Sequence, residues 1–436
     1  MKTKWVLLSM YVILGNFKTF AQNKQLSIQQ AIELATNHSK QAKAADTKVT
    51  GKMLELAVSK NSQLPDAKIN GQFGLLSSPN VNLRIPLANE GNSMQVNANQ
   101  LMLGQVNISV PLYAGGKIKN GIRIAASSVE AERYTALNVK EQLATQVIKL
   151  YVSLYTAKQT SKLMQENIKR STQQVDDFNA MEKNGLIARN DLLKAKLQLS
   201  NYRVALQEAD KNVNVINYQL VTLLQLDEST KITPEDFLVK EHPLNQNTSI
   251  NEVYNNRYDL KLLESQHHLA EDRLKISKAD YLPSVALTGG YVAADIKNVI
   301  AITNAMNIGI GLSYDLGSIY KNKKNVDLAK HNITQIEQQI DIAHDKVKIQ
   351  LQQANENFSL AKNQELVYKQ AVEQANENYR IVKDKYDNGV ADTDDLLEAD
   401  VQQVQSQINE AVSKANVLEK YYDLLLANGQ LISNNI

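Results

Sequence analysis

The amino-acid sequence predicts a mainly α-helical protein that also contributes strands to a membrane β-barrel. Three observations predict this fold class: an internal duplication, four short segments of alternating hydrophobicity, and two very long helical stretches. The composition agrees with it. Charged residues make up 22% and hydrophobic residues 43% of the 436 residues, which is typical neither of a disordered chain nor of a bundle of membrane helices.

The N-terminal segment has the pattern of a secretion signal. Two lysines precede an apolar run from Trp5 to Leu14, and Thr19-Phe20-Ala21 offers small residues at both cleavage positions, so we place the signal at residues 1–21. A retained membrane anchor is the alternative, which the shortness of the run disfavours. Cleavage removes three lysines and no acid, so the formal net charge falls from +2 to −1. A near-neutral chain gives no reason to expect nucleic acid as a partner.

The sequence contains no cysteine. Disulfides, thiolate chemistry, cysteine-bound metal and lipidation of an N-terminal cysteine are therefore excluded. After the signal, no run approaches the roughly 20 apolar residues that a membrane helix needs. If the exported protein enters a membrane, we expect it to do so through strands that close into a barrel.

The mature chain repeats one structural unit. We place the first copy at residues 22–228 and the second at 249–427, with a linker at 229–248 and a tail at 428–436. Repetition at this length indicates a duplicated unit rather than a short-period solenoid. Because the linker is polar and contains prolines, we expect irregular structure there.

Local signals recur at matching places in both copies. Each copy opens with a capping box, Ser27 to Gln30 and Ser249 to Glu252, and each opening helix ends at a Leu-Pro pair. Each copy also carries an Asn-Gly turn, with the two glycines 204 residues apart at Gly185 and Gly389. The order helix, strand, strand, long helix, turn and helix is therefore predicted twice.

Four segments alternate apolar and polar residues over about ten positions. They lie at about 66–75, 104–113, 284–293 and 306–315. This length and period fit a strand that crosses the outer membrane, and a soluble half-buried sheet is the alternative. Four strands cannot close a barrel, so several chains must pool their strands. Three chains would give twelve strands, although the pattern itself does not choose three over two or four.

The helical stretches are long enough to form coiled coils. Residues 118–180 contain one glycine and no proline, which gives roughly 90 Å of continuous helix, and residues 319–385 contain neither. Apolar residues recur at three- and four-residue spacing along both stretches. After each Asn-Gly turn the chain returns as an antiparallel helix, predicted at 188–226 and 392–426.

The order of these signals resembles the TolC family of outer-membrane efflux proteins, also known as outer membrane factors. The most specific matches are Pro111 to Gly116, Ser313 to Gly317 and the segment from Tyr386 to Ala399, and the resemblance covers essentially the whole mature chain. It implies a homotrimer with a twelve-stranded barrel in the outer membrane and an α-helical tunnel in the periplasm. It also implies a periplasmic adaptor and an inner-membrane pump as partners.

The function that this resemblance implies is a passive export channel of a tripartite efflux or type I secretion system. The channel would carry substrate from the pump across the periplasm and the outer membrane, in contact with outer-membrane lipid. A pore-less periplasmic coiled-coil scaffold is the alternative. It leaves the four alternating segments unexplained.

The two helical turns carry opposite charge. Residues 386–400 contain six acids and no base, whereas residues 182–196 contain two acids and four bases. Asp395 and Glu398 are three residues apart on one helix face, and in a symmetric oligomer each would form a ring of carboxylates that favours cations. The resemblance implies such an aperture ring at these positions. The alternative is that the acids near the helix start, including Asp395, cap the helix and interact with its dipole.

Two further sets of tip residues follow from the resemblance. Family members often carry an arginine two residues after the second tip glycine, where this chain has Ala391. We therefore expect a different closing contact, with the candidates Asp191, Arg189 and Lys194. Turn residues expected to contact the adaptor are Gly185, Leu186, Gly389 and Val390, although both glycines also suit a tight turn.

The remaining candidate positions are structural. We expect Gly115, Gly116 and Gly317 to permit the bends between strand and helix. His267 and His268 point to different helix faces and have no histidine partner three or four residues away, so we expect no metal site. The sequence also lacks a nucleophile motif and a phosphate loop. We expect neither a cofactor nor enzyme activity, and energy for transport must come from a partner.

Overall fold

The computed structural model describes residues 23–77, 98–235 and 249–432. The predicted signal at 1–21 lies outside the described residues. The chain forms two compact units, here called the strand unit (Ala44–Asn138 and Arg257–Lys346) and the tip unit (Met1–Lys43, Val139–Asn256 and Val347–Ile436). Each compact unit draws on both halves of the sequence, so the units do not coincide with the predicted sequential copies.

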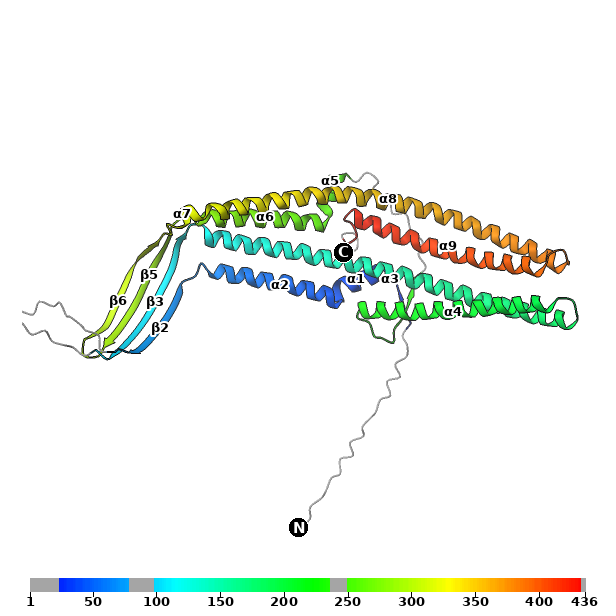
Figure 1. The fold of residues 1–436 in the computed structure, drawn as a ribbon, viewed down its shortest axis with the longest axis horizontal. Helices are drawn as coiled ribbons and strands as arrows, with labels where there is room; N and C mark the ends of the chain where they lie inside the picture. Colours follow the sequence, from blue (N-terminus) through cyan, green and yellow to red (C-terminus); the bar gives the residue numbers. More distant parts are fainter. Residues whose placement is uncertain (1–22, 78–97, 236–248, 433–436) are drawn as a thin grey trace, which may run out of the picture. The chain divides into compact units, whose positions relative to one another are not determined.

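Two helix–strand–strand–helix segments build the strand unit (Figure 1). The first consists of α2 (Lys40–Asn61), β2 (Asp66–Leu75), β3 (Gln100–Ala114) and the start of α3 (Lys117–Lys183). The second consists of α6 (Tyr258–Ala279), β5 (Ser284–Ile296), β6 (Ile300–Ser313), α7 (Ser318–Lys321) and the start of α8 (Lys323–Asp387). The mainly helical fold class is confirmed. Within the described residues, no helix has the length and apolar character required to cross a lipid bilayer.

The four strands form one antiparallel sheet in the order β2-β3-β5-β6. Residues that pair directly across strands share a face. Two apolar rows cross the sheet, namely Ile69, Val106, Tyr291 and Met306, and Ala67, Ile108, Gly289 and Ile308. The polar row between them is Lys68, Asn107, Gly290 and Asn307. One face of the sheet is therefore apolar in every strand, and Ile69 and Ile308 are each 83% exposed on it.

Strand β2 lies at the predicted 66–75, whereas the other strands differ from the predicted ranges. Strands β5 and β6 also extend into residues 294–305, between the predicted strands, where Ile302 pairs with Ala294 and Ile300 with Ile296. A register shift after Val292 places these two isoleucines on the face of the polar row. Strand β6 ends at Ser313, before the predicted Asp315. The Asp315 side chain accepts a hydrogen bond from the backbone N–H of Gly317 at 2.9 Å and so turns the chain out of the sheet.

Four long helices build most of the tip unit: the remainders of α3 and α8, together with α4 (Arg189–Leu223) and α9 (Thr393–Ala427). Helices α3 and α8 end 204 residues apart, and α4 and α9 have equal lengths of 35 residues. The smaller elements are β1 (Asn23–Leu26), α1 (Ile28–His38), β4 (Lys231–Pro234) and α5 (Ile250–Asn256). The offset seen in the sequence therefore extends through both return helices.

The linker contains regular structure that the sequence did not predict. Residues 229–248 were expected to be irregular, but Lys231–Pro234 forms β4, which pairs in parallel with β1. The Asn217 side chain holds β4 by donating to Thr230 O at 2.9 Å and accepting from Ile232 N at 2.8 Å. The expectation was wrong here because a strand of four residues depends on a partner that lies 208 residues away in sequence.

Polar side chains break two of the predicted helices. Between α1 and α2, Ser39 adopts an extended conformation, and its hydroxyl accepts from Ala42 N at 3.1 Å. Between α7 and α8, the buried Asn322 donates its side-chain amide to the carbonyl oxygen of Ser277 on α6. The Ser39 hydroxyl satisfies a backbone N–H at the start of α2, whereas Asn322 satisfies a carbonyl near the end of α6.

The main core of the tip unit packs β1, α1, α3, α4, β4 and α9 together. Tyr151 lies at its centre and is 1% exposed. Its hydroxyl donates to Leu26 O at 2.8 Å and accepts from Glu235 N at 2.9 Å. Burial raises the pKa of Tyr151 to about 12. One buried side chain therefore connects the chain segments that carry the two short strands.

This pKa shift predicts a specific loss of stability in alkali. The unfolded chain releases the proton near pH 10, whereas the folded chain keeps it until about pH 12, so the stabilisation is complete below pH 10 and is lost as pH rises toward 12. The stabilisation that is lost amounts to about 2–3 kcal/mol, since each unit of difference between the folded and unfolded pKa corresponds to about 1.36 kcal/mol. In denaturant unfolding at pH 8, 10 and 11.5, the free energy of unfolding should decline less with pH for Tyr151→Phe than for the wild type. The exposed Tyr218→Phe variant serves as control, and parallel curves for all three proteins would contradict the assignment.

Candidate functional site: the helical tip

The two helical turns share one backbone geometry. Gly185 and Gly389 both have a φ of 71°, in the left-handed region that favours glycine. Gly185 N donates to Glu182 O and Gly389 N donates to Tyr386 O, both at 2.9 Å. The residue after each glycine donates to a carbonyl five residues earlier, which completes the Schellman motif that ends α3 and α8. The glycines therefore have a structural role whatever else the turns do.

The residues that follow these glycines are exposed. Leu186 is 69% exposed and Val390 is 75% exposed. Just inside the turns, side chains from α3, α4, α8 and α9 form a small apolar core, whose buried members are Phe178, Leu192, Ala195, Leu396 and Leu397. Phe178 and Tyr386 stack with ring centroids 5.7 Å apart. The core holds both turns in place while one apolar side chain on each remains open to a partner.

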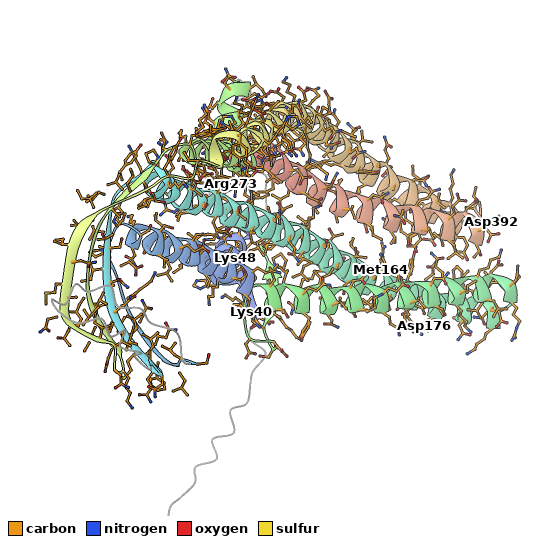
Figure 2. All side chains as sticks on the ribbon, turned by 60° about the vertical axis from the view of Figure 1, so that its left-hand side comes forward. Lys40, Lys48, Met164, Asp176, Arg273 and Asp392 are labelled. Carbon is orange, nitrogen blue, oxygen red and sulfur yellow. The ribbon has the colours of Figure 1, made fainter. Side chains whose placement is uncertain are left out.

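The start of α9 is closed by a capping box of two acids. Asp395 N donates to Asp392 Oδ1 at 2.9 Å, and Asp392 N donates to Asp395 Oδ2 at 3.4 Å. Figure 2 shows Asp392 at this end of α9. Carboxylates here also interact favourably with the positive end of the helix dipole. The capping interpretation therefore applies to Asp395 within a single chain.

Asp395 and Glu398 line one surface recess of about 300 Å³, together with Lys385, Ala391 and Gln402. Both carboxylates are exposed, and Glu398 accepts a hydrogen bond from Gln402 at 3.1 Å. Among the described residues, no ion pair involves either carboxylate. Two negative charges on one face near the tip are thus available to ions in solution or to a neighbouring chain.

Lys194 joins the starts of α4 and α9 by an ion pair. Its ammonium group lies 2.6 and 2.7 Å from the two carboxylate oxygens of Asp394, and 4.0 Å from Asp191. The hydrogen bond to Asp394 raises the pKa of Lys194. Of the predicted closing residues, the structure therefore brings Lys194 and Asp191 together, while Arg189 is exposed at the first position of α4.

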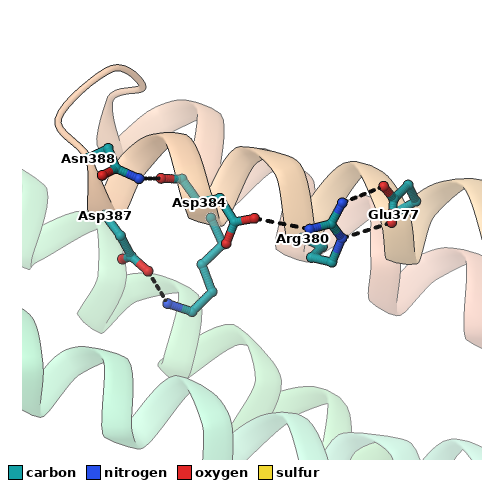
Figure 3. A network of polar contacts seen from close by, with 6 residues as sticks. Glu377, Arg380, Asp384, Asp387 and Asn388 are labelled. Atoms are coloured by element: carbon teal, nitrogen blue, oxygen red, sulfur yellow. Dashed lines mark hydrogen bonds and ion pairs between the residues drawn. The ribbon is translucent and has the colours of Figure 1, made fainter.

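A row of charged contacts strengthens the last turns of α8 (Figure 3). Arg380 donates two hydrogen bonds to Glu377, at 2.7 and 2.9 Å, and one to Asp384 at 3.1 Å. Lys383 lies 2.8 Å from Asp387, and the Asn388 side chain donates to Asp384 O at 2.6 Å. Exposed ion pairs contribute little to stability because water screens them, so these contacts support the helix end rather than form a binding site.

Further from the turns, a buried polar group crosses the helices and was missed by the sequence analysis. Tyr202 donates to Asp400 Oδ2 at 2.6 Å, and Asp400 is 5% exposed. Arg170 donates to Gln403 at 2.8 Å and lies 3.8 Å from Asp400. Burial, and next the charge of Asp400, raise the pKa of Tyr202. The spacing of the residues could have indicated the burial of Asp400, because Asp400 follows Leu396 by one helical turn and so lies on the apolar face of the helix.

The predicted bend glycines behave differently from one another. Gly115 and Gly116 have φ values of 61° and 85°, and a Cβ on Gly115 would lie 2.9 Å from the carbonyl oxygen of Ala279. The bend between β3 and α3 therefore requires glycine. Gly317 has a φ of −64°, which any residue adopts, so the bend before α7 does not depend on the backbone freedom of glycine.

Comparisons with known proteins place this architecture among channel proteins. The sequence matches the family described as outer membrane efflux protein over residues 31–224 and 249–430. No curated protein sequence matches the chain.

Several solved structures share the fold. The outer membrane channel CmeC of Campylobacter jejuni has 17% identity and a TM-score of 0.79, with 93% of this chain and 86% of that chain covered. The outer membrane protein VceC of Vibrio cholerae has 15% identity and a TM-score of 0.77, with 92% of this chain and 96% of that chain covered. The outer membrane channel MtrE of Neisseria gonorrhoeae has 18% identity and a TM-score of 0.74, with 93% of this chain and 89% of that chain covered.

Proposed function

Because the chain belongs to the outer membrane efflux protein family, we propose that it is a passive export channel of the bacterial outer membrane. The channel carries substrate that an inner-membrane pump delivers, through a periplasmic helical portion and across the outer membrane. It is not a catalyst, and the pump supplies the energy. The observation that carries this function is a sheet with one continuous apolar face attached to two helices of more than sixty residues.

The sheet supports membrane insertion as part of an oligomer. Its edge strands β2 and β6 each pair on one side only within the part of the chain that the structure describes. Unpaired edges are not tolerated in lipid, so each edge must pair with another copy. Three copies would provide twelve strands, which is within the range of closed membrane barrels. The apolar rows would then face lipid, and the polar row that contains Lys68 and Asn307 would face the lumen.

The long helices support the same assembly. Helix α8 exposes a series of large apolar side chains that a monomer would leave in water: Leu328, Ile342, Ile349, Leu360, Leu366 and Val367. Burying such side chains is worth roughly 1.5–3 kcal/mol each. Contact with neighbouring copies in a homotrimer would remove this surface from water.

The tip residues take their proposed roles within this trimer. Asp395 and Glu398 form rings that favour cations at the periplasmic aperture. The exposed Leu186 and Val390, on the turns made by Gly185 and Gly389, contact the periplasmic adaptor. The Lys194–Asp394 ion pair holds the starts of α4 and α9 of each chain together and so contributes to closure, in place of an arginine at Ala391.

We expect Lys194→Gln to open the channel more often. A single exposed ion pair contributes little, but a trimer carries three of them, so we expect roughly a severalfold rise in the open fraction. Single-channel recording measures this fraction. Lys383→Gln is the matched control, because Lys383 also makes a 2.8 Å ion pair near the tip but only within α8. An equal effect of both variants, or none for Lys194→Gln, would contradict the closing role.

Membrane extraction tests the proposed function against the scaffold alternative. The mature protein from a Gram-negative host should sediment with the outer membrane, resist washing with alkaline carbonate and urea, and dissolve only in detergent. A scaffold without a membrane sheet would be released by the wash. Release of the wild-type protein would therefore overturn the channel assignment.

A further inference from the structure

A cluster of histidines and carboxylates lies between α6 and α8 in the strand unit, apart from the tip. His267 and His268 come from α6, as does Glu271, and Glu337 comes from the facing part of α8. His267 Nε2 lies 3.5 Å from Glu337 Oε1, and His268 Nδ1 lies 3.5 Å from Glu271 Oε2. One ligand atom from each of the three α6 residues lies within 4.8 Å of the other two.

The sequence analysis expected no metal site because neither histidine has a histidine one helical turn away. That criterion did not count carboxylates. Glu271 follows His267 by four residues and His268 by three, so it lies within reach of both rings. The ring centroids of the two histidines are 6.0 Å apart, and their planes make an angle of 70°. The helix thus brings two imidazoles and a carboxylate together despite the adjacency of the histidines.

Further acids surround the same recess. Its volume is about 280 Å³, and its lining consists of Glu264, His267, His268, Glu337, Ile340 and Asp341. The His267 side chain is 23% exposed and so is partly shielded from solvent, whereas the His268 side chain is 68% exposed. Among the described residues, the cluster therefore combines two imidazole side chains, whose nitrogens can coordinate a metal ion, with several carboxylates.

We propose that this cluster binds one divalent transition-metal ion of the Zn²⁺ type, through His267, His268, Glu271 and Glu337. Imidazole with carboxylate suits Zn²⁺, Ni²⁺, Co²⁺ or Cu²⁺, whereas Ca²⁺ and Mg²⁺ prefer oxygen ligands alone. Tetrahedral Zn²⁺ requires ligand atoms about 3.3 Å apart, given bonds of about 2.0–2.2 Å. The ligand atoms of the three α6 residues lie within 4.8 Å of one another, so side-chain rotation must bring them closer for an ion to be held.

The ion would connect α6 and α8 at this point. Three ligands come from consecutive turns of α6, and Glu337 alone comes from α8. Loss of Glu337 should therefore weaken the affinity and also remove the link between the helices. Loss of His267 should weaken the affinity most, since its ring lies between Glu337 and the other α6 ligands.

Metal binding to the full mature chain in detergent, purified without a polyhistidine tag and freed of metal by a chelator, tests the proposal. We expect isothermal titration with ZnCl₂ to give one ion per chain and a micromolar Kd. His267→Ala and Glu337→Gln should each raise Kd at least tenfold. His331→Ala is the matched control, because His331 is exposed on α8 and lies six residues before Glu337.

A second readout reports the ligands directly. Co²⁺ at the same site should give visible absorption bands of a low-coordinate complex, and His267→Ala should abolish them. Ca²⁺ should not compete. Circular dichroism checks that each variant is folded. Absence of Zn²⁺ binding at 1 mM, roughly a thousandfold above the expected Kd, would overturn the proposal, and so would equal binding by His267→Ala and the wild type.

Discussion

Ile308→Arg is expected to abolish stable insertion of the protein into the outer membrane. Ile308 is 83% exposed on β6, in the apolar row that also contains Ile108 and Ala67. An arginine on the lipid face costs about 2–4 kcal/mol near the middle of the bilayer. A trimer carries the change three times, so the total of about 6–12 kcal/mol is comparable with the entire stability of a typical domain.

The opposite face provides the control. Asn307→Arg places the same charge one residue earlier, in the polar row with Asn107 and Gly290. This variant should still reach the outer membrane as a folded oligomer. Sedimentation with the outer membrane and the mobility of unheated samples in detergent gels measure the outcome. Equal insertion of both variants would mean that the apolar face does not meet lipid.

Removing the charges of Asp395 and Glu398 is expected to abolish most of the cation preference of the channel. The double variant Asp395→Ala with Glu398→Ala should bring the ratio of cation to anion permeability close to one and weaken block by multivalent cations. Both carboxylates are exposed and free of ion pairs in the described chain, so in a trimer they supply six negative charges near the aperture. Reversal potentials in a salt gradient measure the ratio.

The capping role of Asp395 requires a second variant. Asp395→Ala also removes one half of the capping box, the bond that Asp395 accepts from Asp392 N, while Asp392 remains the N-cap. Asp395→Asn with Glu398→Gln keeps hydrogen-bond acceptors but removes the charges, so it should lose selectivity while α9 stays capped. Asp394→Asn is the control and should change opening rather than selectivity. Retained selectivity in the Asn–Gln variant would leave Asp395 with its capping role alone.

Features with local signals could be predicted from the sequence. Strand β2 lies at the predicted residues because alternation is visible within ten positions. Both turns were located from Asn-Gly pairs, and the offset of 204 that they show continues to the ends of the return helices, at Leu223 and Ala427. In each case the residues that determine the structure are neighbours in the chain.

Features that depend on distant partners could not be predicted. Strand β4 exists because β1 pairs with it, and the buried Asn322 between α7 and α8 donates to the carbonyl of Ser277 on α6. At the tip, charge counting grouped Asp400 with the exposed acids, although its contact with Tyr202 buries it. The cluster at His267 likewise requires α8 to supply Glu337. Only the packed structure shows these juxtapositions.

The most direct test of the central proposal is planar-bilayer conductance of the detergent-purified mature protein, with the oligomer mass determined in the same preparation. The proposed function predicts a trimer that gives small, cation-selective and mostly closed conductance steps. A water-soluble monomer or dimer without conductance would contradict it. The alternating segments would then form an ordinary sheet of a coiled-coil scaffold.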